Sequence, residues 1–440
     1  MQSPSRRNGQ RTGGAYLSPA ALLCGLLVAA LLLISVVPGV SRAHDEPYFP
    51  FLKKANEGDV ESQFTLGLML VRGRHMEKNV ELGMLWLEQA AQNGHNGSRY
   101  LLGTLFSKDS RSYGLKADHE KALHWYAQAA QDGDAMAQLE MGRMILFGQG
   151  TSADERKAAR WIEKAAKTGN PEAQYDLGLM YNLGRGVSQD HGKAARWHKL
   201  AAGQGIPAAL FSMGWMHLYG KGLRQDDVKA AGYYEQAANL GHSEAAFHLG
   251  WLYLTGRGVT RSHSAAANWF RKAAEVGHTE AQYHLGILYD QGLGAPKNPQ
   301  KAGKWISIAA RSGHGPAQGV LGMMHSRGSA VEQDNIQALM WLMLAVENPS
   351  VRADGTFGKE VVTLMGRMTR EEVKEAETLA NQRKPFQGKG PQPDGEESAS
   401  RLLEGELENL LAGISPQYAP PMGRVSRAFY PASGPLSSVN

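Results

Sequence analysis

Histidine is the residue type in this 440-residue chain whose spacing looks most like a chemical site. His242, His278 and His314 are 36 residues apart, and His95 stands in a matching position earlier in the chain. Zinc bonds imidazole nitrogens at about 2.0–2.1 Å. Packed helices in neighbouring repeats lie roughly 8–10 Å apart, which is too far for successive histidines to share an ion. We therefore interpret these histidines as packing at loops or helix starts, and predict neither a metal nor any other cofactor.

Signatures of catalysis are missing from the sequence. It contains no Ser-x-x-Lys, Gly-x-Ser-x-Gly, His-Glu-x-x-His or P-loop pattern. The only cysteine is Cys24, near the N-terminus, so the rest of the chain offers no thiolate or disulfide. We predict no catalytic residues and no enzymatic activity. A hydrolase whose groups come together from distant positions stays open as an alternative.

The net charge of +5 does not indicate a nucleic-acid partner. Residues 1–43 hold four arginines and no acid, and the remaining chain has 43 basic against 42 acidic residues. These charges are interspersed, whereas nucleic-acid binding requires a basic face.

The histidines recur because they belong to a longer sequence motif that repeats about every 36 residues. The structure of this repeat therefore decides where they lie. A fixed period of this length is typical of solenoids, in which each repeat packs only on its neighbours. A central glycine marks the eight repeats: Gly67, Gly103, Gly142, Gly178, Gly214, Gly250, Gly286 and Gly322.

Each repeat is predicted to form two helices. In the fourth, Asn170 and Pro171 are suited to begin the first helix, and Gly184 to end it in a left-handed cap. The central glycine would cost about 1 kcal/mol relative to alanine in an isolated helix, so its recurrence predicts a close helix contact. The second helix should begin with an N-cap residue seven positions before an aromatic residue predicted to face the core. The eight N-cap positions are Asn79, Asp118, Asp154, Asp190, Asp226, Ser262, Asn298 and Asp334. The eight aromatic positions are Trp86, Trp125, Trp161, Trp197, Tyr233, Trp269, Trp305 and Trp341.

The full motif is Ala-x-x-x-Leu-Gly-x-x-Tyr-x-x-Gly-x-Gly-Val, followed by Asp-x-x-Lys-Ala-x-x-Trp-x-x-x-Ala-Ala-x-x-Gly. It resembles the Sel-one-like repeat, a relative of the tetratricopeptide repeat, over residues 59–348. The resemblance implies an all-α, α/α superhelical solenoid that binds partners on its concave side and has no family-wide catalytic residues.

One variable position, directly after the central glycine, is our candidate for partner binding. In the fourth to eighth repeats it holds Leu179, Trp215, Trp251, Ile287 and Met323. On a concave face these would form an apolar stripe with two tryptophans, a residue type enriched at binding hot spots. The alternative is that they pack between neighbouring repeats. A second row, three residues before the glycine, is interpreted as packing between repeats, and would suit stacking on sugars if it were exposed. It comprises Phe64, Tyr100, Tyr175, Phe211, Phe247 and Tyr283.

Five segments are predicted along the chain. Residues 1–43 combine arginines with an apolar run over 20–37, which is typical of a cleaved secretory signal or a retained membrane anchor. Residues 44–58 are expected to cap the array, 59–348 to form it, and 349–384 to close it with two helices, the second opened by a capping box at Thr369 and Glu372. Residues 385–440 are rich in Gly, Pro and Ser and are predicted to be disordered. Within them, 401–411 carries five leucines and is interpreted as a transient helix or as one that folds on a partner.

These patterns predict an exported, periplasmic scaffold that binds a protein, such as an envelope assembly component or a membrane sensor. A protein associated with the cell wall or with exopolysaccharide is the alternative, with a glycan as the partner. Contact with a membrane is expected only through residues 1–43, if they are retained.

Overall fold

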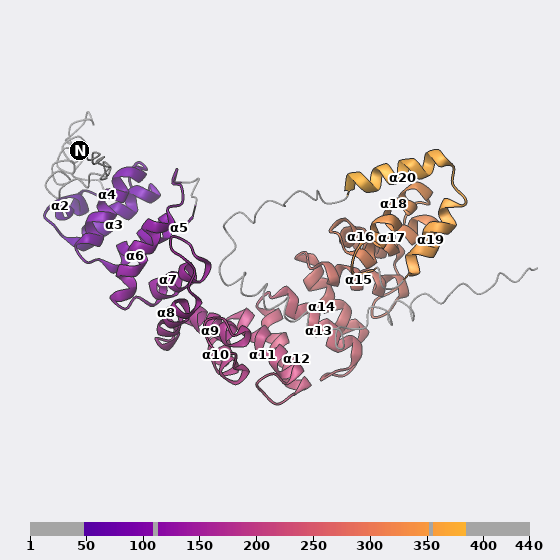
Figure 1. The fold of residues 1–440 in the computed structure, drawn as a ribbon, viewed down its shortest axis with the longest axis horizontal. Coiled ribbons are helices and arrows are strands. Elements are labelled where there is room, and N and C mark those ends of the chain that lie inside the picture. The colour runs from indigo at the N-terminus through magenta and orange to yellow at the C-terminus, as the bar shows by residue number, and fades with distance from the viewer. Residues whose placement is uncertain (1–47, 109–112, 352–354, 384–440) are drawn as a thin grey trace, which may run out of the picture. The chain divides into compact units, whose positions relative to one another are not determined.

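The computed structural model describes residues 48–108, 113–351 and 355–383. These residues contain 19 α-helices and no strand, which confirms the predicted all-α solenoid. Figure 1 shows the order of the helices along the chain. The chain divides into an N-terminal part, ending at Met141 and including 149–151, and a C-terminal part formed by 142–148 and the residues from Ser152 onward. The predictions for residues 1–43 and 385–440 lie outside the described residues. No helix in the described residues is both long and apolar enough to cross a bilayer.

Sixteen of the helices alternate as the first and second helix of the eight repeats. The first helices are α3 (Val60–Arg72), α5 (Asn96–Ser107), α7 (Ala135–Phe147), α9 (Pro171–Leu183), α11 (Pro207–Tyr219), α13 (Ser243–Thr255), α15 (Thr279–Gln291) and α17 (Gly315–Arg327). The second helices are α4 (Val80–Gln92), α6 (His119–Gln131), α8 (Glu155–Lys167), α10 (His191–Gly203), α12 (Asp227–Asn239), α14 (His263–Glu275), α16 (Pro299–Arg311) and α18 (Asn335–Glu347). Three further helices flank them: α2 (Phe49–Asn56), α19 (Thr356–Met365) and α20 (Arg370–Arg383).

Helix starts are fixed separately in every repeat. All eight predicted N-cap side chains accept a hydrogen bond from the backbone N–H three residues later. Asn170 caps α9 with Pro171 behind it, and Gly184 ends that helix in the left-handed conformation. These predictions are confirmed, and each cap satisfies an N–H that has no partner within its helix.

The central glycines make the predicted close contact. A Cβ on Gly250 would lie 2.7 Å from the ring of Phe270 and 3.3 Å from the carbonyl oxygen of Ala266, both on the paired helix α14. A Cβ on each of the other seven central glycines would meet the residue at the same position of the paired second helix. These residues are Leu87, Tyr126, Ile162, His198, Tyr234, Ile306 and Leu342. The glycine therefore lets the two helices of each repeat approach one another.

The prediction that the aromatic row of the second helices faces the core is wrong for five repeats. Trp86, Trp125 and Trp341 are buried, but the other five aromatic residues, Trp161, Trp197, Tyr233, Trp269 and Trp305, are only half-buried. The position opposite the glycine is taken by the next residue, which is turned about 100° further around the helix. The amino groups of Lys164 and Lys272 lie 3.9 Å from the ring centroids of Trp161 and Trp269, so lysines cover part of this row.

Successive repeats are joined by the second glycine of the Gly-x-Gly loop. Gly258 has φ +70°, and a Cβ there would lie 2.1 Å from the carbonyl oxygen of Asp227, in the second helix of the preceding repeat. The first and last repeats replace this glycine by His75 and Ala330, which are the two non-glycine residues with positive φ among the described residues.

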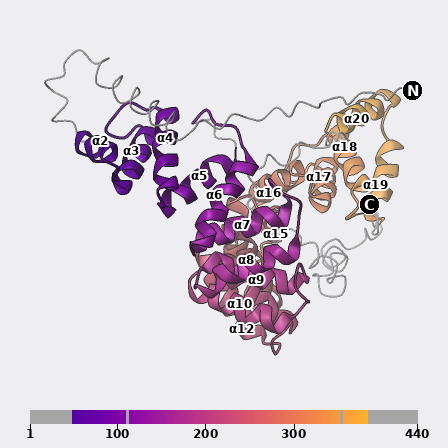
Figure 2. The same ribbon diagram turned by 60° about the vertical axis from the view of Figure 1, so that its left-hand side comes forward.

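The C-terminal end of the array is closed by α19 and α20, which both pack on α18. Figure 1 and Figure 2 show α20 lying beside α18 in both views. The predicted capping box is confirmed: the Thr369 hydroxyl accepts from the Glu372 N–H at 3.3 Å, and Glu372 accepts from the Thr369 N–H at 2.8 Å.

Candidate functional site

Four of the five residues predicted to bind a partner are buried. Leu179 is 0% exposed, Trp215 and Ile287 6%, and Met323 9%. Trp215 packs against Ala194 and Ala195 of the preceding repeat, and Met323 belongs to a cluster with Leu342 and Leu364. These four side chains therefore lie in the interior of the array. Trp251 differs, because it keeps part of its surface accessible.

Helix α13 presents that accessible surface as one stripe. Glu244, His248, Trp251 and Thr255 are spaced by four, three and four residues, so they lie on one face of the helix. The side chains of Glu244 and His248 are 33% and 26% exposed, and Thr255 is exposed. The two middle positions of the stripe are buried in α9, α11, α15 and α17. Among the first helices of the repeats in the C-terminal part, α13 is therefore the one in which no position of the stripe is buried.

The recurring histidines join successive repeats at the start of this stripe. His278 is the N-cap of α15: its Nδ1 accepts from the Ala281 N–H at 3.2 Å. The proton of the neutral ring is then on Nε2, which donates to Glu244 at 2.7 Å. The ring also stacks on Phe247, with centroids 4.7 Å apart.

The same arrangement recurs at the other histidines. In the N-terminal part, His95 caps α5, has its Nε2 3.2 Å from Glu61, and packs on Phe64 with the rings tilted and their centroids 4.4 Å apart. His314 caps α17, packs on Tyr283, and has its Nε2 3.0 Å from a Glu280 oxygen, although without hydrogen-bond geometry. His242 caps α13 and stacks on Phe211, but Ala208 stands where a glutamate would pair with it.

This geometry uses both nitrogens of the His278 ring. Its Nδ1 accepts a hydrogen bond from the backbone N–H of Ala281, and its Nε2 donates a hydrogen bond to the Glu244 carboxylate. A metal would have to break one of these bonds. The described residues contain no group of three or more His, Cys, Asp or Glu placed to hold an ion. Capping and packing of the next helix is thus the role that the contacts support.

Burial and hydrogen bonding shift the pKa values of three side chains in this region. Burial alone would raise the pKa of Glu244, but the hydrogen bonds from His248 and His278 hold it well below its usual range. Burial lowers the pKa of His242 and His284 to about 4. At neutral pH the Glu244 side chain is therefore a carboxylate, and the rings of His242 and His284 are neutral.

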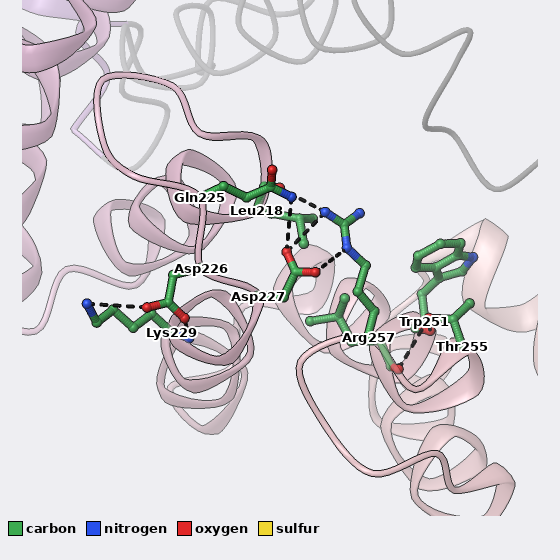
Figure 3. A network of polar contacts seen from close by, with 9 residues as sticks. Leu218, Gln225, Asp226, Asp227, Lys229, Trp251, Thr255 and Arg257 are labelled. Carbon is green, nitrogen blue, oxygen red and sulfur yellow. Dashed lines mark hydrogen bonds and ion pairs between the residues drawn. The ribbon is translucent and has the colours of Figure 1, made fainter.

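A polar clamp joins the loop after α13 to the repeat before it. Figure 3 shows Arg257 reaching Asp227 and Leu218. Its Nε donates to one Asp227 oxygen at 2.7 Å and its Nη2 to the other at 3.0 Å, while Nη2 also donates to the Leu218 carbonyl at 2.9 Å. Two parallel bonds to a carboxylate fix the angle between the groups as well as their distance. The clamp therefore restrains the loop that follows the open stripe. Arg185 and Glu155 make an equivalent contact at 2.9 Å two repeats earlier.

Sequence reasoning missed the glutamates of the stripe and the clamp. Glu61, Glu244 and Glu280 each stand 34 residues before the histidine that they approach. A search for acids at one fixed separation from the recurring histidine would have found them. The exposure of Trp251 has no comparable signal, because the equivalent residues Leu179, Trp215, Ile287 and Met323 are also apolar but are buried.

Comparison with known proteins agrees with this geometry. The Sel1 repeat family matches eight consecutive segments between residues 60 and 349. The crystal structure of a Sel1 repeat protein from Oxalobacter formigenes is 28% identical to this chain with a TM-score of 0.57, and the similarity covers 81% of this chain and 97% of that one.

Curated relatives match over shorter stretches of 95 residues. Chitin synthase regulatory factor 3 of Schizosaccharomyces pombe is 37% identical over 20% of this chain, and protein NMB1327 of Neisseria meningitidis is 32% identical over 22%. The chain covers 10% and 20% of the lengths of these two relatives.

Eight consecutive matches, the shared fold and the glycine contacts lead to one conclusion: the chain belongs to the Sel1 repeat family.

Proposed function

We propose that this chain is an exported, non-enzymatic scaffold in the bacterial periplasm that binds a protein through the stripe on α13. Sel1 repeat proteins are in general non-catalytic scaffolds that bind other proteins. The partner that we propose is an envelope assembly component or the sensor part of a membrane regulator. Export is supported by the arginines and the apolar run of residues 1–43.

The observation that carries the binding proposal is the partial exposure of Trp251. A tryptophan with an accessible face supplies a large, rigid contact area and is enriched at binding hot spots. His248 and Glu244 beside it offer polar groups for the rim of an interface. The equivalent Trp215 is buried, so it serves as a matched structural control.

A protein partner is favoured over a glycan by the contacts of the second aromatic row. Phe211 and Phe247 would need open ring faces to stack on sugars, but both are buried, and His242 and His278 stack on them. A glycan partner is therefore an outcome of the test and not a second proposal.

The test is a pull-down from the cell envelope with the wild-type chain, Trp251→Ala and Trp215→Ala. We expect Trp251→Ala to lose a discrete protein band with little change in the melting temperature. Trp215→Ala should lower stability by about 3–5 kcal/mol, as expected for truncating a buried tryptophan. Unchanged binding by a folded Trp251→Ala variant would reject the stripe, and retention on insoluble glycan instead of a protein band would reject the protein partner.

A further inference from the structure

The C-terminal helix pair leaves an apolar groove at its turn. Helices α19 and α20 pack on α18, and α19 also contacts α17. Leu364 is buried against Met323 and Leu342, which fixes α19 on the array. Beyond this contact the end of α19, the turn and the start of α20 border an open groove of about 480 Å³. The groove is thus a feature of the closed end of the array.

The groove and its rim expose side chains that would normally be covered. Met365, Met368 and Val373 form its apolar wall, and Met365 is 41% exposed. Val362, one helical turn before Met365, is 72% exposed. Arg370, Lys374 and Glu377 complete the lining, so it has more positive than negative side chains. An occupant should therefore combine an apolar stripe with acidic neighbours.

The chain contains such a segment beyond the described residues. Residues 401–411 read Arg-Leu-Leu-Glu-Gly-Glu-Leu-Glu-Asn-Leu-Leu. Leu403, Leu407 and Leu410 are spaced by four and three residues, which places them on one face of a helix. Three glutamates against one arginine give the segment a net charge of −2. Its pattern and its charge both complement the groove.

The 17 residues between α20 and the leucine-rich segment are long enough for that segment to reach the groove. Residues 384–400 join the end of α20 to the segment, and α20 runs back from Arg383 to Arg370 at the groove. Thirteen helical steps of 1.5 Å make this distance about 20 Å. A random-coil estimate for 17 residues gives a root-mean-square span of roughly 21–25 Å. Effective concentration is greatest when the span of the linker matches the distance to be covered.

We propose that residues 401–411 dock as an amphipathic helix in the groove between α19 and α20 of the same chain. The leucines cover Met365, Met368 and Val373, and the glutamates lie near Arg370 and Lys374. An effective concentration of the order of 1 mM would give roughly tenfold more docked than undocked chain if the free segment binds at about 100 µM. The proposal goes beyond partner binding on α13 and is independent of it.

Hydrogen exchange of the full chain, followed by mass spectrometry, tests this docking. The first variant carries Leu403→Asp with Leu407→Asp, which alters none of the described residues. The control is Val425→Asp with Phe429→Asp, which adds the same two negative charges at apolar positions outside 401–411. We expect α19 and the first half of α20 to exchange roughly tenfold faster in the leucine variant than in the wild type or the control.

A groove variant tests the other side of the contact. Val373→Asp in the groove lining should speed exchange over 401–411, whereas Val346→Asp at an exposed apolar position on α18 should not. Melting followed by circular dichroism confirms that each variant is folded. Equal exchange in the wild type and the leucine variant would overturn the proposal. Protection that disappears on dilution would also overturn it, because it would show that a second copy supplies the segment.

Discussion

Replacing Gly250 by alanine tests the contact on which every repeat depends. The new Cβ would lie 2.7 and 2.8 Å from two atoms of the Phe270 ring. Carbon atoms prefer separations of about 3.5–4.0 Å, so the ring or the helix must move by roughly 1 Å. Phe270 is 0% exposed and is flanked by Phe247 and His284, with centroid distances of 5.7 and 5.4 Å. The ring therefore has little room to yield.

The magnitude follows from a comparison with a second glycine. Gly232 lies inside α12, and a Cβ there would meet no atom within 4 Å. Gly232→Ala should therefore stabilise the protein by about 1 kcal/mol through helix propensity alone. Gly250→Ala has the same gain, but we expect an overpacking cost of about 2–3 kcal/mol. The difference in unfolding free energy between the two variants isolates this steric cost.

Urea unfolding followed by far-ultraviolet circular dichroism measures the difference. Because repeat arrays need not unfold in one step, hydrogen exchange of α13 and α14 should accompany it. The double variant Gly250→Ala with Phe270→Leu should show a favourable coupling of about 1 kcal/mol, since the smaller side chain relieves the clash. If Gly250→Ala were as stabilising as Gly232→Ala, the close contact would not exist in solution.

Three further predictions concern the loops, the histidines and the clamp. Gly258→Ala should destabilise the fold by more than about 2 kcal/mol, because it places a Cβ at a positive φ and against the Asp227 carbonyl. Ala330→Gly should stabilise the fold by about 1 kcal/mol, because it removes a Cβ from a positive φ. Thermal unfolding of both variants checks these predictions. Burial lowers the pKa of His284 from 6.5 to about 4, so on acidification the unfolded chain binds a proton at this residue before the folded protein does. The contribution of His284 to the free energy of unfolding is therefore complete above pH 6.5 and is lost as the pH falls toward 4. Unfolding of His284→Phe should depend less on pH across that window, and an unchanged slope would contradict the assignment. Arg257→Lys keeps the charge but loses the two parallel bonds to Asp227, and should cost about 1–2 kcal/mol in chemical unfolding; full stability would show that the clamp is not formed.

Local sequence signals predicted most of the fold. The N-cap residues and the left-handed glycines act over three or four residues, so their types alone located the helix ends. The close approach at Gly178 could be predicted too, because glycine inside a helix is unfavourable without such a reason. The residue that contacts the glycine could not be predicted, because its type varies between repeats, as Ile162, His198 and Phe270 show. The recurring tryptophan next to it in sequence gave a stronger but misleading pattern.

The candidate site was less predictable because exposure depends on how neighbouring repeats pack. Trp215 and Trp251 occupy equivalent positions, yet only Trp251 keeps an accessible face. The contact of His278 with Glu244 joins residues 34 positions apart in successive repeats, and periodicity within one repeat does not show it. Residue type predicted which positions are apolar, and packing between repeats decided which of them a partner can reach.

Photo-crosslinking in living cells tests the central claim most directly. A photoreactive amino acid would replace Trp251 on α13 and, as a control, the exposed Lys199 on α10. The account predicts that position 251 forms a discrete crosslink to a protein in the envelope fraction and that position 199 does not. Equal crosslinking at both positions, or no crosslinked protein from a folded chain, would contradict recognition of a partner by the α13 stripe.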